Sequence, residues 1–252
     1  MNIQIRSLLA IMALFSPAIS LADSGPLGWG DEEIAEEMET DRPDFTEGTQ
    51  TLAPGHFQFE LGYTYTEDND EGINASSHSL PELLMRIGLV DKLEFRFGWE
   101  GYVYSDIEDH NSDGYSDVNI GFKYALYKQS GVLPDLSVIA ALSSPSGSRD
   151  VTSDRYDPEV KLLWSYGLDG YGVSGNLNFS SLSGEHERYL EVANSVAVGT
   201  DLSDQIGLYV EYFGFYPTEN VIETTEHYAN GCFTFAVNCN LQIDLRVGFG
   251  LN

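Results

Sequence analysis

The stretch ELLMRIGLVDKLEFRFGWEGYVY, residues Glu82 to Tyr104, decides the fold. Large apolar side chains occupy every second position on both sides of Asp91-Lys92, and most positions between them carry a charge or a glycine. Period-2 alternation is typical of an extended strand with one apolar and one polar face. The two residues between the runs suffice for a tight turn, so the stretch predicts a β-hairpin.

The chemistry of the two faces separates a membrane barrel from a soluble one. A soluble barrel would place its apolar side chains inside, but the polar face of this hairpin carries interspersed acids and bases, such as Glu82, Arg86, Glu94 and Arg96. Each run is about ten residues long, which is enough for a tilted strand to cross a bilayer. Apolar side chains outward and charges inward are the pattern of an outer-membrane barrel.

The same alternation runs from His56 to the end of the chain and predicts eleven strands. Long polar connections such as 105–115 alternate with short turns, as external loops and periplasmic turns do in such barrels. A soluble β-sandwich predicts no such rule. Because single-chain bacterial barrels close with an even number of strands, we expect about 12 in the complete protein, with 11 visible and the last strand missing. The expected fold is an all-β, antiparallel transmembrane β-barrel.

Three segments make up the predicted organisation. Residues 1–22 hold Arg6 before a short apolar run and a small-x-small site at Ser20-Leu21-Ala22, which predicts a cleaved secretory signal peptide. Residues 23–54 are rich in acids and read as a solvated periplasmic arm or a partial plug, with a short helix possible over Asp31 to Glu39. Residues 55–252 form the barrel, so we expect export to the bacterial outer membrane, with its lipid as a partner.

Net charge excludes one class of partner. The chain carries 12 basic and 40 acidic residues, for a formal charge of −28. Nucleic-acid binding requires Lys and Arg to neutralise phosphates, so it is not expected. The two cysteines, Cys232 and Cys239, differ in strand parity, and we expect them to stay unpaired.

Two blocks of sequence resemble a known family. METDRPDFTE at Met38 to Glu47, followed by LAPGHFQ at Leu52 to Gln58, is similar to the start of the outer-membrane transporters grouped under the meta-pathway of phenol degradation. The segment SDVNIGFKY from Ser116 and the ending NLQIDLRVGFGLN from Asn240 are similar too. The resemblance implies a barrel that passes small, often aromatic or apolar compounds.

The inward positions supply the candidate site. We expect their charged side chains to line the lumen and to select solutes electrostatically, unless they neutralise one another and plug a closed barrel. These predicted lumen-lining residues are Glu60, Glu82, Arg86, Glu94, Arg96, Glu100, Lys123, Glu159, Lys161, Glu211, Asp244 and Arg246. The leading hypothesis is a channel or transporter for small hydrophobic or aromatic solutes, and the alternative is a plugged structural or surface-binding barrel with acidic loops.

One motif suggests a metal. Asp109, Asn111 and Asp113 match the D-x-N-x-D-G core of a calcium loop, and Asp117 stands at its ninth position. The twelfth position, where a bidentate Glu belongs, is Ile120, and acidic external loops are usually only solvated. We therefore expect no cofactor, with Ca²⁺ at these four residues as the one candidate.

The chain shows no catalytic pattern. Its five histidines fall at predicted strand ends or in loops, no G-x-S-x-G motif is present, and no paired His or Cys spacing suits zinc. We expect no enzymatic activity, although a barrel enzyme acting on lipid remains a minor alternative.

Overall fold

The structure is a computed structural model that describes residues 6–11, 38–70, 73–107, 110–184, 187–218 and 225–251. Every regular element in these ranges is a β-strand, and none is a helix that could span a membrane. The strands are β1 (Arg6–Ile11), β2 (Phe57–Asp70), β3 (Ile73–Val90), β4 (Leu93–Trp99), β5 (Tyr102–Ile107), β6 (His110–Tyr115), β7 (Val118–Tyr127), β8 (Asp135–Ser144), β9 (Asp157–Leu168), β10 (Tyr171–Ser183), β11 (Arg188–Ser203), β12 (Ile206–Thr218), β13 (Glu226–Asn238) and β14 (Leu241–Gly250).

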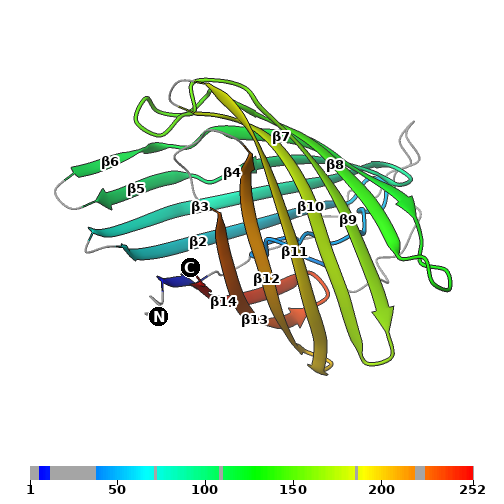
Figure 1. Ribbon diagram of the computed structural model, residues 1–252. Coiled ribbons are helices and arrows are strands. Elements are labelled where there is room, and N and C mark those ends of the chain that lie inside the picture. Colours follow the sequence, from blue (N-terminus) through cyan, green and yellow to red (C-terminus); the bar gives the residue numbers. More distant parts are fainter. Residues whose placement is uncertain are drawn as a thin grey trace.

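The strands form one antiparallel sheet that curls into a barrel (Figure 1). From β7 to β14 each strand pairs with its neighbour in sequence, while β4 bridges β7 and β3, and β3 pairs with β2. Each pairing is antiparallel, as tight hairpin connections require. The all-β, antiparallel barrel predicted from the sequence is therefore confirmed.

The ring is closed by β1. β1 lies between β2 and β14 and pairs with both. If β1 were absent, those two strands would be the edges of an open sheet. It matches β14 over Arg6–Ile11, but it matches β2 only at Leu8↔Thr66 and Leu9↔Tyr65. The sequence predicted no strand here, since residues 1–22 were assigned to a signal peptide. The signal peptide stays a prediction, and its residues 1–5 and 12–22 lie outside the described ranges. Residues 31–37 of the expected helix lie outside them too.

The strands extend farther than the hydrophobic pattern predicted. The predicted loop 105–115 was wrong, because β5 and β6 form a hairpin there, with Tyr102↔Tyr115 at its base. Likewise, β2 and β3 continue to Asp70 and Ile73 through residues predicted as loop. Apolar alternation marks only the part of a strand that meets lipid, whereas backbone pairing continues into water where both faces are polar.

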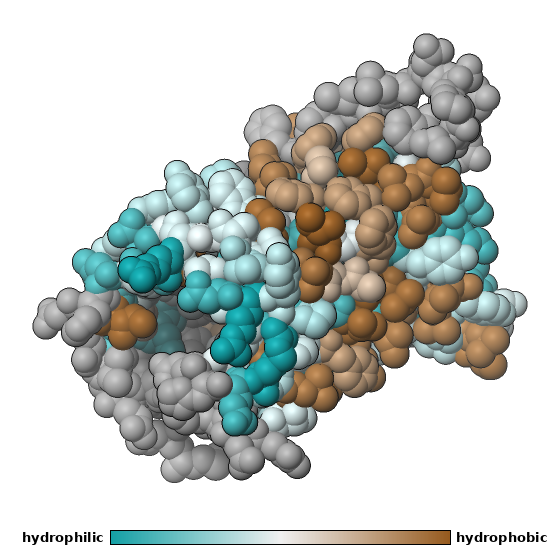
Figure 2. Space-filling model, turned by 90° about the horizontal axis from the view of Figure 1, so that it is seen from above, coloured by the Kyte–Doolittle hydropathy of each residue, from teal (hydrophilic) through white to brown (hydrophobic). Residues whose placement is uncertain are grey.

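The outer wall carries the apolar side chains. Figure 2 shows a brown apolar belt across the wall with teal hydrophilic residues at either end, as a bilayer-spanning barrel requires. On β7 the exposed positions alternate with buried ones, so the predicted outward set is the exposed set. Outward large apolar residues with more than a third of their surface exposed include Ile120, Phe122, Tyr124, Leu142, Val160, Leu162, Phe179, Val196, Val198, Val210, Phe233, Phe235, Ile243, Leu245 and Phe249.

The lipid-facing wall yields a stability prediction. Phe122→Lys, in the middle of β7, should destabilise the barrel in a bilayer by about 2–4 kcal/mol, because the charge would sit in hydrocarbon. Val132→Lys provides the control, since Val132 lies in the exposed β7–β8 turn. Denaturant unfolding from lipid vesicles measures both; equal effects for the two variants would contradict this placement of the membrane.

Candidate functional site

Residues 40–52, here called the plug segment, lie inside the barrel. Their polar groups reach opposite walls: Thr40 Oγ1 donates to Asp244 on β14 at 3.2 Å, and the Thr49 hydroxyl lies 2.7 Å from that of Ser165 on β9. Between these ends, Thr46 Oγ1 donates to Ser195 Oγ on β11 at 2.7 Å. The chain then leaves the lumen and continues into β2 (Figure 1). The part of the acidic arm that the structure describes is thus largely a plug.

A glycine on the wall makes room for the end of the plug. A Cβ at Gly88 would lie only 2.0 Å from the carbonyl oxygen of Ala53, so any larger residue would collide with backbone. Gly55, with φ of +81°, donates from its N–H to Gly88 O at 2.8 Å. Only glycine tolerates the close approach at Gly88, and glycine readily adopts the positive φ of Gly55. The plug therefore enters beside the end of β3 that carries the short Asp91-Lys92 turn.

Asp41 is the centre of the ionic contacts. Its Oδ2 accepts hydrogen bonds from Arg96 Nη1 at 2.5 Å and from Lys123 Nζ at 2.6 Å, and it lies 3.5 Å from Arg86 Nη1. Burial alone would raise the pKa of Asp41, but the cations of Arg86, Lys123 and Arg96 hold it well below its usual range. Asp41 is therefore an anion that three wall cations share.

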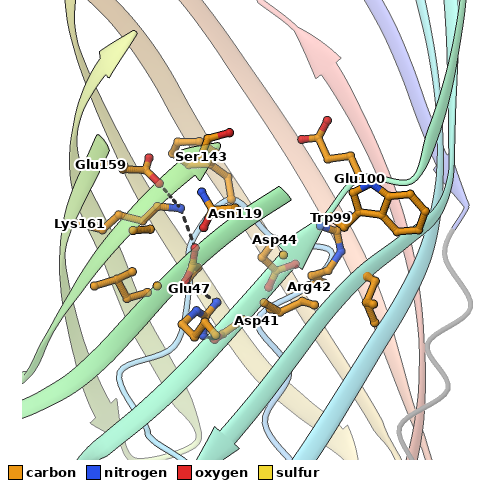
Figure 3. A pocket seen from close by; sticks show the side chains of 18 of the residues that line it. Asp41, Arg42, Asp44, Glu47, Trp99, Glu100, Asn119, Ser143, Glu159 and Lys161 are labelled. Atoms are coloured by element: carbon orange, nitrogen blue, oxygen red, sulfur yellow. Dashed lines mark hydrogen bonds and ion pairs between the residues drawn. The ribbon is translucent and has the colours of Figure 1, made fainter. Parts of the chain in front are cut away.

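Glu47 makes a second ionic contact farther along the plug. It accepts a hydrogen bond from Arg96 Nη2 at 2.8 Å and one from Lys161 Nζ at 2.7 Å (Figure 3). Lys161 also pairs with Glu159 at 3.3 Å. Burial opposes ionisation of Glu47, yet Arg96 and Lys161 lower its pKa to about 2. Asp41 and Glu47 therefore both remain charged at neutral pH.

Acids of the wall bind the backbone of the plug. Glu60 accepts hydrogen bonds from Asp41 N at 3.1 Å and Arg42 N at 2.7 Å, while Glu211 accepts one from Thr46 N at 2.5 Å. Arg86 forms a bidentate pair with Glu94 and also donates to carbonyl oxygens of the plug. The charged groups of the wall and the polar groups of the plug are therefore hydrogen-bond and ion-pair partners of each other, as buried charges require.

A cavity of about 420 Å³ lies against the plug. Asp41, Arg42, Asp44 and Glu47 form the plug side of it (Figure 3). Its wall includes Trp99, Asp117, Ser143 and Glu159, which lie near the strand ends that carry the longer connections. We call this cavity the vestibule; it also contains apolar groups, including Leu83, Leu84, Ile139 and Ala141.

The structure places the predicted lumen-lining residues as follows. Glu60, Glu82, Arg86, Glu94, Arg96, Lys123, Glu211 and Asp244 are buried, while Glu159 and Lys161 are half-buried and line the vestibule. Glu100 is exposed at the vestibule, and Arg246 is half-buried on β14. Nine of these charges contact the plug segment directly, a role that the sequence did not predict for any of them: Glu60, Glu82, Arg86, Glu94, Arg96, Lys123, Lys161, Glu211 and Asp244.

Sequence reasoning missed an aromatic cluster in the interior. Phe213 and Phe215 on β12 contact the ring of Phe45 on the plug, and Tyr228 on β13 packs against both of these phenylalanines. A signal existed, because Phe213 and Phe215 share the parity of inward Glu211.

The proposed calcium ligands lie on extended backbone. Asn111 and Asp113 are on β6, paired with Asp106 and Tyr104, and Asp117 accepts hydrogen bonds from Gly147 N and Ser153 N. Asp109 lies outside the described residues. Within the part of the chain that is described, no three His, Cys, Asp or Glu side chains are grouped as metal ligands. Cys232 and Cys239 are free, as expected.

The plug contacts predict a loss of docking when Asp41 is neutralised. Asp41→Asn should lower the free energy that holds the plug by about 3–5 kcal/mol, because buried Arg96 and Lys123 lose their shared anion. Hydrogen exchange should show it as faster exchange of the Gly48 N–H, which donates to Asp41 Oδ1 at 2.8 Å. Asp157→Asn is the control, since Asp157 pairs with Arg188 on β11. Unchanged exchange at Gly48 would contradict the role of Asp41.

The contribution of Asp44 to plug docking should have the opposite pH dependence. Burial and the nearby Glu211 carboxylate raise the pKa of Asp44 well above its usual range, and its Oδ1 has no hydrogen-bond partner in the described structure. Docking stability from protonated Asp44 is complete below the usual aspartate pKa and is lost as pH rises through the raised one. Asp44→Asn should therefore raise the melting temperature at pH 8 and change it little at pH 3.5. An equal change at both pH values would sink this assignment.

Comparisons with known proteins give the family. No curated protein matches the chain significantly. A crystal structure of Pseudomonas aeruginosa OccK11 (OpdR) aligns over 98% of this chain and 95% of that chain with 8% identity, but its TM-score of 0.32 is too low to support an argument. The profile of the family described as "Putative MetA-pathway of phenol degradation" matches residues 40–252, from the first residue of the plug segment onward. The resemblance inferred from the sequence is confirmed, and the chain belongs to this family.

Proposed function

We propose that the protein is a bacterial outer-membrane channel for small hydrophobic or aromatic solutes, closed at rest by its own plug segment. The observation that carries the proposal is the vestibule, whose floor is the plug itself. At about 420 Å³ it lies within the usual range of small-molecule pockets. A solute that enters from the side of the longer connections meets no covalent obstacle, only a segment held by ion pairs and hydrogen bonds.

The interactions that hold the plug suit a reversible closure. Asp41 and Glu47 dock through charge-assisted hydrogen bonds to Arg96, Lys123 and Lys161. Arg96 and Lys161 would each keep a neighbouring wall acid if the plug withdrew, because Glu94 and Glu159 already contact them. The open lumen would therefore keep partners for these cations, which favours a channel that opens over one that is permanently filled.

Export through the signal peptide at residues 1–22 belongs to the same proposal. The apolar belt of the outer wall requires a bilayer, and β-barrels of this pattern are built into outer membranes. Cleavage after Ala22 would remove β1 and leave β2 and β14 as free edges. N-terminal sequencing of the protein from membranes tests this step.

A plugged structural barrel is the second candidate, and the filled lumen favours it. In that case the dense ion pairs of the plug serve only to stabilise the fold. The two candidates differ in what plug release does: a channel opens, whereas a structural barrel only loses stability.

The test measures solute flux as well as current. In proteoliposomes, wild type should admit a small neutral aromatic such as phenol, and Asp41→Asn should increase the rate because its plug is held less firmly. Gly98→Met should slow entry, since Gly98 lines the vestibule and a Cβ there meets only Asn119 Cβ at 3.6 Å. The lipid-facing Phe235→Ala controls for folding. Flux at the protein-free rate for every variant would support the structural candidate instead.

A further inference from the structure

The ring of Phe45 sits in an aromatic box inside a lumen that is otherwise lined largely by polar and charged groups. It stacks on Phe213 with centroids 4.7 Å apart and planes 15° apart, and it meets Phe215 edge-on at 5.1 Å. Tyr228 stacks on Phe213 at 5.0 Å and meets Phe215 edge-on at 6.2 Å, so it packs against both residues that hold Phe45. These are favourable geometries of aromatic pairs, so Phe213 and Phe215, backed by Tyr228, form a site for one ring. We call Phe213, Phe215 and Tyr228 the aromatic box.

The residue that fills the aromatic box belongs to the plug segment and not to the barrel wall. Phe45 is on the plug segment, whereas Phe213 and Phe215 are on β12 and Tyr228 is on β13. Phe45 also lines the vestibule. Ring occupancy of the box and docking of the plug are therefore one event, next to the cavity that a solute would enter.

Small inward residues flank the box and leave it room. Ala193 and Ser195 on β11 pair across the sheet with Phe215 and Phe213. Both are buried, and neither reaches far into the lumen. If Phe45 withdrew, the space that its ring leaves would be bounded by aromatic faces and by these short side chains.

Polar groups beside the box have a surplus of acceptors. Glu211 accepts hydrogen bonds from Phe45 N, Thr46 N and Asn230 Nδ2, so plug withdrawal would remove two of its donors. Asn176 Nδ2 donates to Phe45 O, while Asn176 Oδ1 and Asn230 Oδ1 are buried without a partner in the described structure. A ligand here must therefore donate hydrogen bonds, and a carboxylate would be repelled by Glu211.

We propose that the aromatic box is the solute-binding site of the lumen and that Phe45 is a tethered occupant that a solute displaces. The ligand class is a small aromatic ring with a hydroxyl or amino donor. Its ring replaces the Phe45 ring, and its donor replaces a plug N–H at Glu211. This inference rests on the proposed channel function and adds the place and the chemistry of recognition.

The mechanism makes solute binding and plug docking mutually exclusive. A ligand that binds only the undocked state shifts the population toward that state by mass action. The apparent affinity is reduced by the fraction of molecules whose box is free. The solute thereby opens its own path, and the channel stays closed in its absence.

Phenol serves as the probe for the test, on the full protein in detergent. Phe45→Ala should bind phenol about tenfold more tightly than wild type if Phe45 fills the box in about nine molecules of ten. Phe213→Leu should weaken binding in the Phe45→Ala background, because the stacking face is lost. Phe235→Ala, a lipid-facing phenylalanine on the neighbouring β13, should change nothing. Calorimetry measures affinity, and retention of a heat-resistant gel mobility shows that each variant is folded.

Two further ligands define the chemistry. Cyclohexanol, which has a donor but no aromatic ring, and benzoate, which has a ring and a carboxylate, should each bind more weakly than phenol. In wild type, phenol should accelerate hydrogen exchange at Thr46 N, and benzoate should not.

The outcomes separate this inference from the channel proposal. Equal phenol affinity for wild type and Phe45→Ala, or affinity unaffected by Phe213→Leu, would overturn the tethered occupant even if phenol flux persists. Tight binding by Phe45→Ala without flux through any variant would uphold the box and refute the channel.

Discussion

The shared anion of Asp41 is the interaction on which the interior depends. Arg86, Arg96 and Lys123 project into one level of the lumen from β3, β4 and β7, and three cations so close would repel one another strongly. Glu60 and Glu94 offset part of that charge, and Asp41 from the plug completes it. At this level the wall supplies two carboxylates against three cations, and the docked plug segment brings the third.

The family match begins at Thr40, the first residue of the plug segment. The block from Thr40 to Glu47 carries Asp41, Arg42, Phe45 and Glu47, and each has a defined partner on the wall. A segment that merely hung in the periplasm would need no such side chains. The wall and the plug have complementary charges, so the two form one unit, although the plug contributes no strand to the sheet.

Two kinds of contact hold the plug, and they respond to different conditions. As pH falls, the ionic contacts of Asp41 and Glu47 are lost only at strongly acidic values, because cations lower both pKa values. The contact of Phe45 with the aromatic box involves no charged group, so no ion pair has to be broken when the ring leaves. Asp44 works against docking as pH rises above the usual aspartate pKa, because burial and the nearby Glu211 raise its pKa. The plug segment is thus held by ion pairs and by an aromatic contact, which respond to different conditions.

The sequence by itself determined which side of each strand faces lipid. Alternation at Ile120, Phe122 and Tyr124, or at Ile243 and Leu245, is a local signal, because neighbouring side chains in a strand point to opposite faces. The sequence also identified the charged inward residues, and it offered a partial plug as one reading of the acidic arm. Only the tertiary structure decided what those charges bind. Asp41 and Lys123 are 82 positions apart, and Thr46 and Glu211 are 165 apart, so no local period relates them. The same holds for the aromatic box and for β1 between β2 and β14: each depends on how the sheet curls, which brings together residues that the chain keeps far apart.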